Sequence, residues 1–325
     1  MKRGWWTIAG LAIAGAMMPA SAQMIRALPP RQQVLDDPVT RANGAAQLER
    51  DRPARWALTE HRRLEKALAG LQPQRKGVVD AYVVSVALDS DPVFGREARE
   101  AGRVLARRYD AVGRTVVLAS GDGREPVATP RGSPDTLAAA LARVAELMNP
   151  AEDVLVLYAT THGAPFGIAY TDGEMGSAMI SPHWLRNVLG ELGIRNRLLI
   201  VSACFSGIFV APLSSDEGVV LSAASSNRTS FGCVSENDWT FFGDAMINHA
   251  LRKPQPIAAA FAEARSLVGD WEARGSLIPS EPQSSFGPGA ARWLAPLEAR
   301  MPKVATASVG RPATEALNVA SRNNH

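Results

Sequence analysis

Cysteine is scarce in this chain, whose 325 residues contain only Cys204 and Cys233. Neither cysteine follows the apolar run at the N-terminus, which argues against a lipoprotein anchor. No His, Cys or Asp cluster has the spacing of metal ligands, so we expect no metal and no cofactor. In an oxidising compartment two cysteines form a disulfide by default, and the alternative is a free reactive thiol at one of them.

Other absences narrow the function further. No basic patch interleaved with aromatic residues stands out, and the formal net charge is +3, so we expect no nucleic-acid partner. The segment around Ser206 lacks the G-x-S-x-G pattern of serine hydrolases. No Gly/Ser linker or internal repeat divides the chain. With 46% hydrophobic and 21% charged residues it has the composition of a globular protein, and its length allows one large α/β domain or two small ones.

The N-terminus has the layout of a secretory signal. A basic start is followed by an apolar run and by Ala20-Ser21-Ala22, so we expect residues 1–22 to be a signal peptide cleaved before Gln23. Export to a bacterial periplasm follows, with no stable membrane span after cleavage. The alternative is an uncleaved membrane anchor, although the apolar run is short for crossing a bilayer.

The remainder alternates between apolar runs and amphipathic segments. We expect residues 23–77 to be a polar lead-in that contains a helix near 54–70, and residues 299–325 to be a disordered tail. Apolar runs at 81–89, 114–120, 153–160, 197–203 and 218–225 predict strands. Helices are predicted between them and over about 242–251 and 256–272, with Ser133 and Ser181 as N-caps. Alternating strands and helices indicate a mostly parallel sheet covered on both faces, in a domain over residues 78–298.

Two of these strands end in residues that carry chemistry. The third ends in "ATTHGAPFG", which contains His162, and the fourth in "SACFSG", which contains Cys204. Because functional groups gather beyond the carboxyl ends of strands in such sheets, we expect the imidazole and the thiol to lie side by side. A histidine can take the proton of a thiol and make it a nucleophile, and the Gly163 and Cys204 N–H groups could stabilise an oxyanion.

Each residue has a simpler interpretation when taken alone. A single cysteine at a strand end is most often a small core residue, and a single loop histidine is usually solvated. Their occurrence at equivalent ends of successive apolar strands favours a catalytic dyad. His61, His183, His249 and His325 show no comparable partner, and we interpret Cys233 as structural.

"DVLVLYATTHG" and "RLLIVSACFSG" resemble the two signature blocks of the legumain family of cysteine peptidases. "LSAASSNRTSFGC", "TFFGDAMIN", "SEPQSSFG" and "VFGRE" extend the similarity over roughly residues 78–298. The resemblance implies a caspase-like three-layer α/β/α sandwich. It also implies His162 as general base, Cys204 as nucleophile, Gly163 and Cys204 as oxyanion donors, and a substrate pocket that includes Arg96, Ser202, Ser230 and Asp244.

The chain departs from the legumain pattern at three positions. Ser202 and Phe205 replace two acids, and Phe94 stands near the position of a third catalytic residue, an asparagine. We therefore expect a cysteine endopeptidase that acts on polypeptides, without a strict preference for asparagine. The alternatives are a transpeptidase or ligase that uses the same dyad, and a catalytically silent interaction module. The oligomeric state and an inhibitory role of residues 23–77 stay open.

Overall fold

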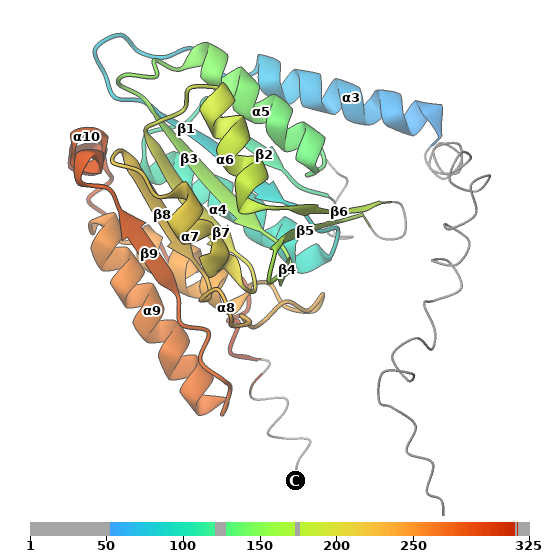
Figure 1. Cartoon of the computed structure of the whole chain (residues 1–325), viewed down its shortest axis with the longest axis vertical. Coiled ribbons are helices and arrows are strands. Elements are labelled where there is room, and N and C mark those ends of the chain that lie inside the picture. Colours follow the sequence, from blue (N-terminus) through green and yellow to red (C-terminus); the bar gives the residue numbers. More distant parts are fainter. Residues whose placement is uncertain (1–52, 121–127, 173–175, 316, 318–325) are drawn as a thin grey trace, which may run out of the picture. The chain divides into compact units, whose positions relative to one another are not determined.

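The computed structural model describes residues 53–120, 128–172, 176–315 and 317. The expected signal peptide and the first part of the lead-in lie outside these residues. At the centre is a six-stranded sheet in the order β2-β1-β3-β7-β8-β9 (Figure 1). The strands are β1 (Ala81–Ala87), β2 (Thr115–Leu118), β3 (Val154–Thr160), β7 (Arg197–Ser202), β8 (Gly218–Ser222) and β9 (Gln283–Phe286). The first five are parallel and β9 is antiparallel to β8, so the predicted mostly parallel sheet is confirmed.

The strands form where the sequence has continuous apolar, β-branched runs, because both of their faces are buried. All seven residues of β1 and all seven of β3 are buried. Successive side chains point to opposite faces, as the pleat requires. Val83, Val156 and Ile200 enter one core cluster, whereas Val84, Leu157 and Leu199 enter the other.

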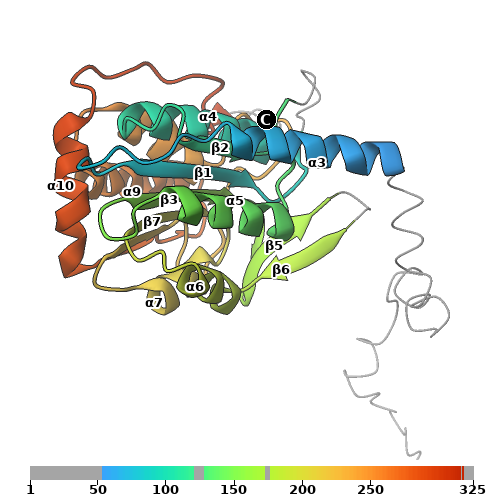
Figure 2. The same ribbon diagram turned by 90° about the horizontal axis from the view of Figure 1, so that it is seen from above.

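Helices cover each face, so the predicted three-layer α/β/α architecture is confirmed (Figure 2). Residues of α4 (Pro92–Arg108) and α9 (Ile257–Arg274) pack into the first cluster. Residues of α5 (Pro134–Leu147), α6 (Pro182–Glu191) and α7 (Val210–Leu213) pack into the second. Ser133 and Ser181 cap α5 and α6 as predicted, each accepting a bond from a backbone N–H in the first turn.

The predicted helix of the lead-in is α3 (Ala54–Ala69), and it packs on the second cluster through Leu64, Ala67 and Leu68. Arg131 lies over the ring of Trp56, 5.4 Å from the ring centroid. The helical part of the expected lead-in is thus an outer layer of the α/β unit.

A second, small sheet follows His162 directly. It consists of β4 (Gly163–Ala164), β5 (Gly167–Thr171) and β6 (Ser177–Ile180), all antiparallel. None of the strands predicted from the sequence lies in this stretch. Its strands are short and half-exposed, so the hydrophobic pattern that predicts buried strands is weak here.

The segment predicted as one helix near 242–251 has three different turns. They are α8 (Phe241–Gly243), a π-helical turn η3 (Asp244–His249) and a 3-10 turn η4 (Ala250–Arg252). The chain then continues through α9, β9 and α10 (Ala291–Arg300), and the last two were not predicted.

The expectation of a disordered tail from residue 299 is wrong for the described residues 301–315. The backbone N–H of Val309 donates to Asn248, that of Arg311 to Asp238 and that of Ala313 to Asp244, at 2.7–2.9 Å. The Ala313 side chain is 1% exposed and belongs to the first core cluster. Residues 301–315, here called the C-terminal strap, are therefore packed on the domain.

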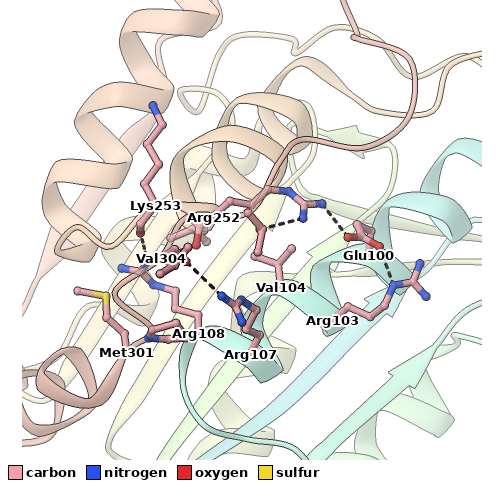
Figure 3. Close-up of a pocket in the computed structure, with 12 residues that line it drawn as sticks. Glu100, Arg103, Val104, Arg107, Arg108, Arg252, Lys253, Met301 and Val304 are labelled. Atoms are coloured by element: carbon pink, nitrogen blue, oxygen red, sulfur yellow. Dashed lines mark hydrogen bonds and ion pairs between the residues drawn. The ribbon is translucent and has the colours of Figure 1, made fainter.

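The strap also closes one side of a cavity of about 150 Å³ (Figure 3). The cavity's lining comes from α4, residues 251–253 and the strap. Arg107 donates to Val304 O at 3.1 Å and Arg252 pairs with Glu100 at 2.7 Å, so these cationic groups already bind the protein's own oxygens. Among the described residues, no helix combines the length and hydropathy needed to cross a membrane.

Candidate active site

The ends of β3 and β7 bring the two predicted catalytic residues to one edge of the sheet. The strands are parallel neighbours with Thr160 opposite Ser202, and His162 and Cys204 each follow two residues later. The backbones are in close contact here, because a Cβ at Gly163 would lie 1.9 Å from Cys204 O. Only glycine fits at this position.

The Cys204 sulfur lies in a polar environment formed by Ser230. The Ser230 N–H donates to Cys204 Sγ at 3.3 Å, and its hydroxyl lies 3.7 Å from the same sulfur. As a thiol, Cys204 can donate in turn to Ser230 O at 3.5 Å. Cys204 is half-buried, so the charged form of its thiol depends on such donors.

The second cysteine is the strongest influence on the first. A hydrogen bond from the Cys233 thiol, with the bonds from Ser230 and the nearby His162, lowers the pKa of Cys204 to about 5, although burial opposes the shift. The same hydrogen bond and burial raise the pKa of Cys233 well above its ordinary value. Cys204 is therefore a thiolate at neutral pH, and Cys233 is the thiol that donates to it. Both cysteines are free.

His162 is exposed, and its ring lies against Phe94. The ring centroids are 5.0 Å apart and the planes meet at 82°, an edge-to-face arrangement. The His162 carbonyl accepts a bond from Ala169 N at 2.8 Å, which ties its backbone to the small sheet. Phe94 is completely buried, so it offers the imidazole a fixed apolar support where a polar third residue was expected from the resemblance.

A buried carboxylate lies beneath the strand ends. Glu97 is 0% exposed and accepts bonds from Tyr158 at 2.5 Å, Thr160 at 2.7 Å and Ser202 at 3.1 Å. Its other oxygen accepts from Thr240 N at 2.8 Å. Four donors satisfy this charge, and they join α4 to β3, β7 and the segment before α8.

The turn after Cys204 is also shaped for close packing. Phe205 has a positive φ of 57°, and its N–H donates to Arg228 O at 2.8 Å. Ser206 is buried, and its hydroxyl accepts from Ala223 N and Ala224 N at 3.0 and 3.2 Å. Ser206 thus fastens the turn after Cys204 to the end of β8.

The four expected pocket residues are placed differently from one another. Ser230 is half-buried beside Cys204. Ser202 is 2% exposed and bonded to Glu97, and Asp244 is 0% exposed and bonded to Asn248 and Ala313 N. Neither Ser202 nor Asp244 is accessible to a substrate in this structure, which corrects the expectation of direct contact. Both carry polar groups whose bonds are used inside the protein.

Arg96, the remaining expected pocket residue, holds a loop. Its guanidinium donates to Ser235 O and Asn237 O and pairs with Asp238 at 3.4 Å. We call residues 230–238, which carry both Ser230 and Cys233, the thiol loop. Arg96 therefore acts on the environment of Cys204 through this loop.

The remaining histidines lie elsewhere. His183 contacts Asn187 at 3.1 Å on α6, His61 contacts Glu65 at 3.4 Å on α3, and His249 contacts Asp244 at 3.4 Å. Among the described residues, no group of three His, Cys, Asp or Glu side chains is arranged to hold a metal ion.

Glu97 was not predicted to belong to the site. The sequence also did not show that Phe94 contacts the His162 ring or that Cys233 lowers the pKa of Cys204. One signal was present for Glu97, since it lies three residues after Phe94 on the apolar side of an amphipathic helix. A carboxylate at such a position must have buried partners. Nothing local distinguishes Cys233 from an ordinary loop cysteine.

Residues 133–282 match the profile of the Peptidase C13 family, and this range includes both His162 and Cys204. The expected resemblance to the legumain family is thus confirmed over a shorter range than 78–298. Similar solved structures include caspase-1 from Spodoptera frugiperda, 11% identical with a TM-score of 0.43 over 67% of this chain and 94% of that chain. No curated protein sequence matches the chain.

Proposed function

We propose that this chain, which matches the Peptidase C13 family over residues 133–282, is a cysteine-type endopeptidase with a His162–Cys204 dyad. The observation that carries the proposal is the contact between Gly163 and Cys204 at the joined ends of β3 and β7. This contact supports the proposal that a Cys204 thiolate acts beside His162, which is exposed. Polypeptide is the substrate class that the family implies.

In the proposed first step the Cys204 thiolate attacks a peptide carbonyl carbon. The carbonyl oxygen becomes an oxyanion, and the backbone N–H groups of Gly163 and Cys204 are the proposed donors to it. His162 gives its proton to the leaving amine, and a thioester remains on Cys204. In the second step His162 takes a proton from water, which hydrolyses the thioester.

The surroundings of the dyad support this division of roles. The hydrogen bonds from Ser230 and Cys233 stabilise the thiolate before substrate binds, so His162 need not remove the thiol proton at neutral pH. Phe94 fixes one face of the imidazole region while His162 stays exposed. Among the expected pocket residues, Ser230 is the one we propose to line the substrate site. Arg96, Ser202 and Asp244 are proposed to shape it from behind.

Labelling with an electrophilic peptide probe tests the nucleophile. We expect attachment at Cys204 and none in Cys204→Ala. Cleavage of a peptide substrate should be about 10²- to 10⁴-fold slower in His162→Ala, which cannot give a proton to the leaving amine. His183→Ala is the matched control, because this histidine lies on α6 beside Asn187. Equal labelling of Cys204 and Cys233 would contradict the activated thiol and favour a silent interaction module.

Hydrolysis is distinguished from transpeptidation by adding an amine nucleophile to a cleavage reaction. An endopeptidase releases mainly the free acid, whereas a ligase diverts most of the thioester into an amide product. Mass spectrometry of the products measures this ratio.

Export is part of the same proposal. Cleavage after Ala22 predicts a mature chain that begins at Gln23. The intact mass of the protein recovered from the periplasmic fraction of an expressing bacterium tests this, and a chain that keeps residues 1–22 in the membrane fraction would support the anchor instead.

A further inference from the structure

The C-terminal strap is bonded to the loop that carries Ser230. The backbone N–H of Arg311 donates to Asp238 Oδ2 at 2.9 Å, and the Arg311 guanidinium donates to Glu236 O. At the other end of the thiol loop, the Ser230 N–H donates to Cys204 Sγ at 3.3 Å. We propose that Arg311 is a positioning residue for the Cys204 thiolate, on which it acts through the thiol loop.

Asp238, at the end of the thiol loop, faces arginines from two segments that are far apart in the sequence. Arg96 Nε of α4 lies 3.4 Å from Asp238 Oδ1, and Arg311 Nε of the strap lies 3.6 Å from Asp238 Oδ2. The Asp238 side chain is 12% exposed, so solvent and salt screen these ion pairs less than they screen a pair on the open surface. Removing the Arg311 side chain takes away the cation that faces Oδ2.

The strap backbone is fitted closely to this end of the loop. Gly310 has a positive φ of 75°, and a Cβ added there would lie 3.1 Å from Asp238 Oδ2 and 3.2 Å from Trp239 Nε1. The backbone can approach so closely because residue 310 is a glycine. Trp239 Nε1 also donates to Val309 O at 2.9 Å. The strap is therefore bonded here independently of its contact with Asp244.

The thiol loop can transmit this restraint because its two ends are bonded to each other. Asn237 Nδ2 donates to Gly232 O at 2.9 Å. This bond ties the end that Arg311 holds to the end that contains Ser230. Residues 234–236, between the two ends, are exposed, so the middle of the loop has little apolar packing to fix its place. The position of the Ser230 N–H therefore depends in part on bonds made at the far end.

Loss of the Arg311 side chain should weaken the hydrogen bond to the thiolate without abolishing it. The bond from Phe241 N to Phe231 O, at 2.9 Å, also holds the Ser230 end of the loop. A donor that moves away from a half-buried thiolate stabilises its charge less, so the thiol keeps its proton to higher pH. The effect on the thiolate does not require peptide hydrolysis, whereas the consequence for cleavage rests on the proposed function.

The experiment measures the pH dependence of alkylation by iodoacetamide in the full chain, with peptide mapping to assign the label to Cys204. For Arg311→Ala we expect the acid limb at higher pH and a rate on that limb about 2- to 10-fold lower. The plateau at alkaline pH should stay nearly unchanged, because the thiol is ionised there in both proteins. His162 and Cys233 also influence the pKa of Cys204, and every variant compared keeps both.

Two further variants test the route through Asp238. Arg311→Lys keeps a positive charge at this position, so it should restore part of the rate that Arg311→Ala loses. Asp238→Asn keeps an acceptor for the Arg311 N–H but removes the charge that both arginines face. It should therefore move the acid limb in the same direction as Arg311→Ala.

Arg300→Ala is the matched control. Arg300 is an exposed arginine at the end of α10, directly before the strap, and it donates to Val79 O at 2.5 Å. Its loss removes a similar contact away from the thiol loop, so the acid limb should stay where it is in the unaltered chain. Thermal unfolding of each variant verifies that it is folded.

An acid limb at the same pH in Arg311→Ala and the unaltered chain would overturn the proposal, as would an equal shift in Arg300→Ala. If Arg311→Ala alone moves the limb but the unaltered chain cleaves no peptide, the positioning role stands and the proposed function fails. If the unaltered chain cleaves peptides and the limb does not move, the proposed function stands and the positioning role fails.

Discussion

His162 and Cys204 follow the neighbouring ends of β3 and β7, and Asp244 lies in the π-helical turn η3. The resemblance to the legumain family assigns all three side chains to one site, but their surroundings in the structure differ. At the strand ends His162 is exposed and Cys204 is half-buried. In η3, Asp244 and Asn248 are 0% and 2% exposed, and their polar groups bind the C-terminal strap. A polar group that solvent and substrate can reach is available for chemistry, whereas one that is buried and fully bonded stabilises the fold.

Because of this difference, substitutions in one region should reduce activity and substitutions in the other should reduce stability. Changes at the strand ends should remove activity and leave unfolding unchanged. Changes in η3 should lower the free energy of unfolding and leave the chemistry of Cys204 unchanged in the folded protein.

The largest effect is expected for Cys204→Ala. Without a nucleophile, kcat/KM for a peptide substrate should fall by about 10⁴-fold or more. The half-buried side chain loses one sulfur, so the urea midpoint should move little. Cleavage assays and urea unfolding on the same preparation measure both. Retained cleavage would show that another residue is the nucleophile.

The next largest effect is expected for Asp244→Ala. It leaves Ala313 N and the Asn248 amide without their buried acceptor, which costs about 2–5 kcal/mol of unfolding free energy for the two groups together. Asp244→Asn keeps one acceptor oxygen and should cost less. Urea unfolding measures the loss, and the alkylation rate of Cys204 should stay unchanged. A raised KM without a loss of stability would instead make Asp244 a substrate-contacting residue.

A smaller effect is expected in the pH dependence of the thiolate. Because the pKa of Cys204 is lowered to about 5, protonation below that pH removes the nucleophile, and kcat/KM should fall on the acid side. Cys233→Ala removes the main hydrogen bond to the thiolate, so the pKa should rise and the acid limb should move to higher pH. Ser230→Ala, which keeps the backbone donor, should move it less.

The pH dependence of Cys204 alkylation measures the thiolate without using peptide cleavage. An acid limb that stays at the same pH in Cys233→Ala would contradict the role of Cys233 as donor.

The sequence predicted the sheet and the position of His162 and Cys204 at neighbouring strand ends, because both depend on local patterns. Buried strands appear in the sequence as apolar runs. The carboxyl ends of neighbouring parallel strands lie at the same edge of the sheet, whatever their side chains are. The His162–Cys204 pairing follows from this rule, as the register of Thr160 opposite Ser202 shows.

The strap and the path of the thiol loop could not be predicted, for a different reason. The strap is held mainly by backbone groups of Val309, Arg311 and Ala313, so its side chains carry no hydrophobic period. The thiol loop is held by Arg96 of α4, which is far away in the sequence. The pattern of side chains indicates which face of a helix or strand is buried. It does not show which residues far apart in the sequence are hydrogen-bonded to each other.

The smallest effect is expected for Phe94→Leu. This variant tests whether the His162 ring at the strand ends depends on the contact with Phe94. Leucine keeps most of the buried volume but removes the edge-to-face contact with His162, which is worth about 0.5–1.5 kcal/mol. We expect kcat to fall about 2- to 10-fold with KM unchanged, because the imidazole is less well positioned for proton transfer. Phe242→Leu, in the core beside Phe261, is the matched control and should lower stability alone. An equal loss of kcat in both variants would mean that Phe94 acts only through the stability of the core.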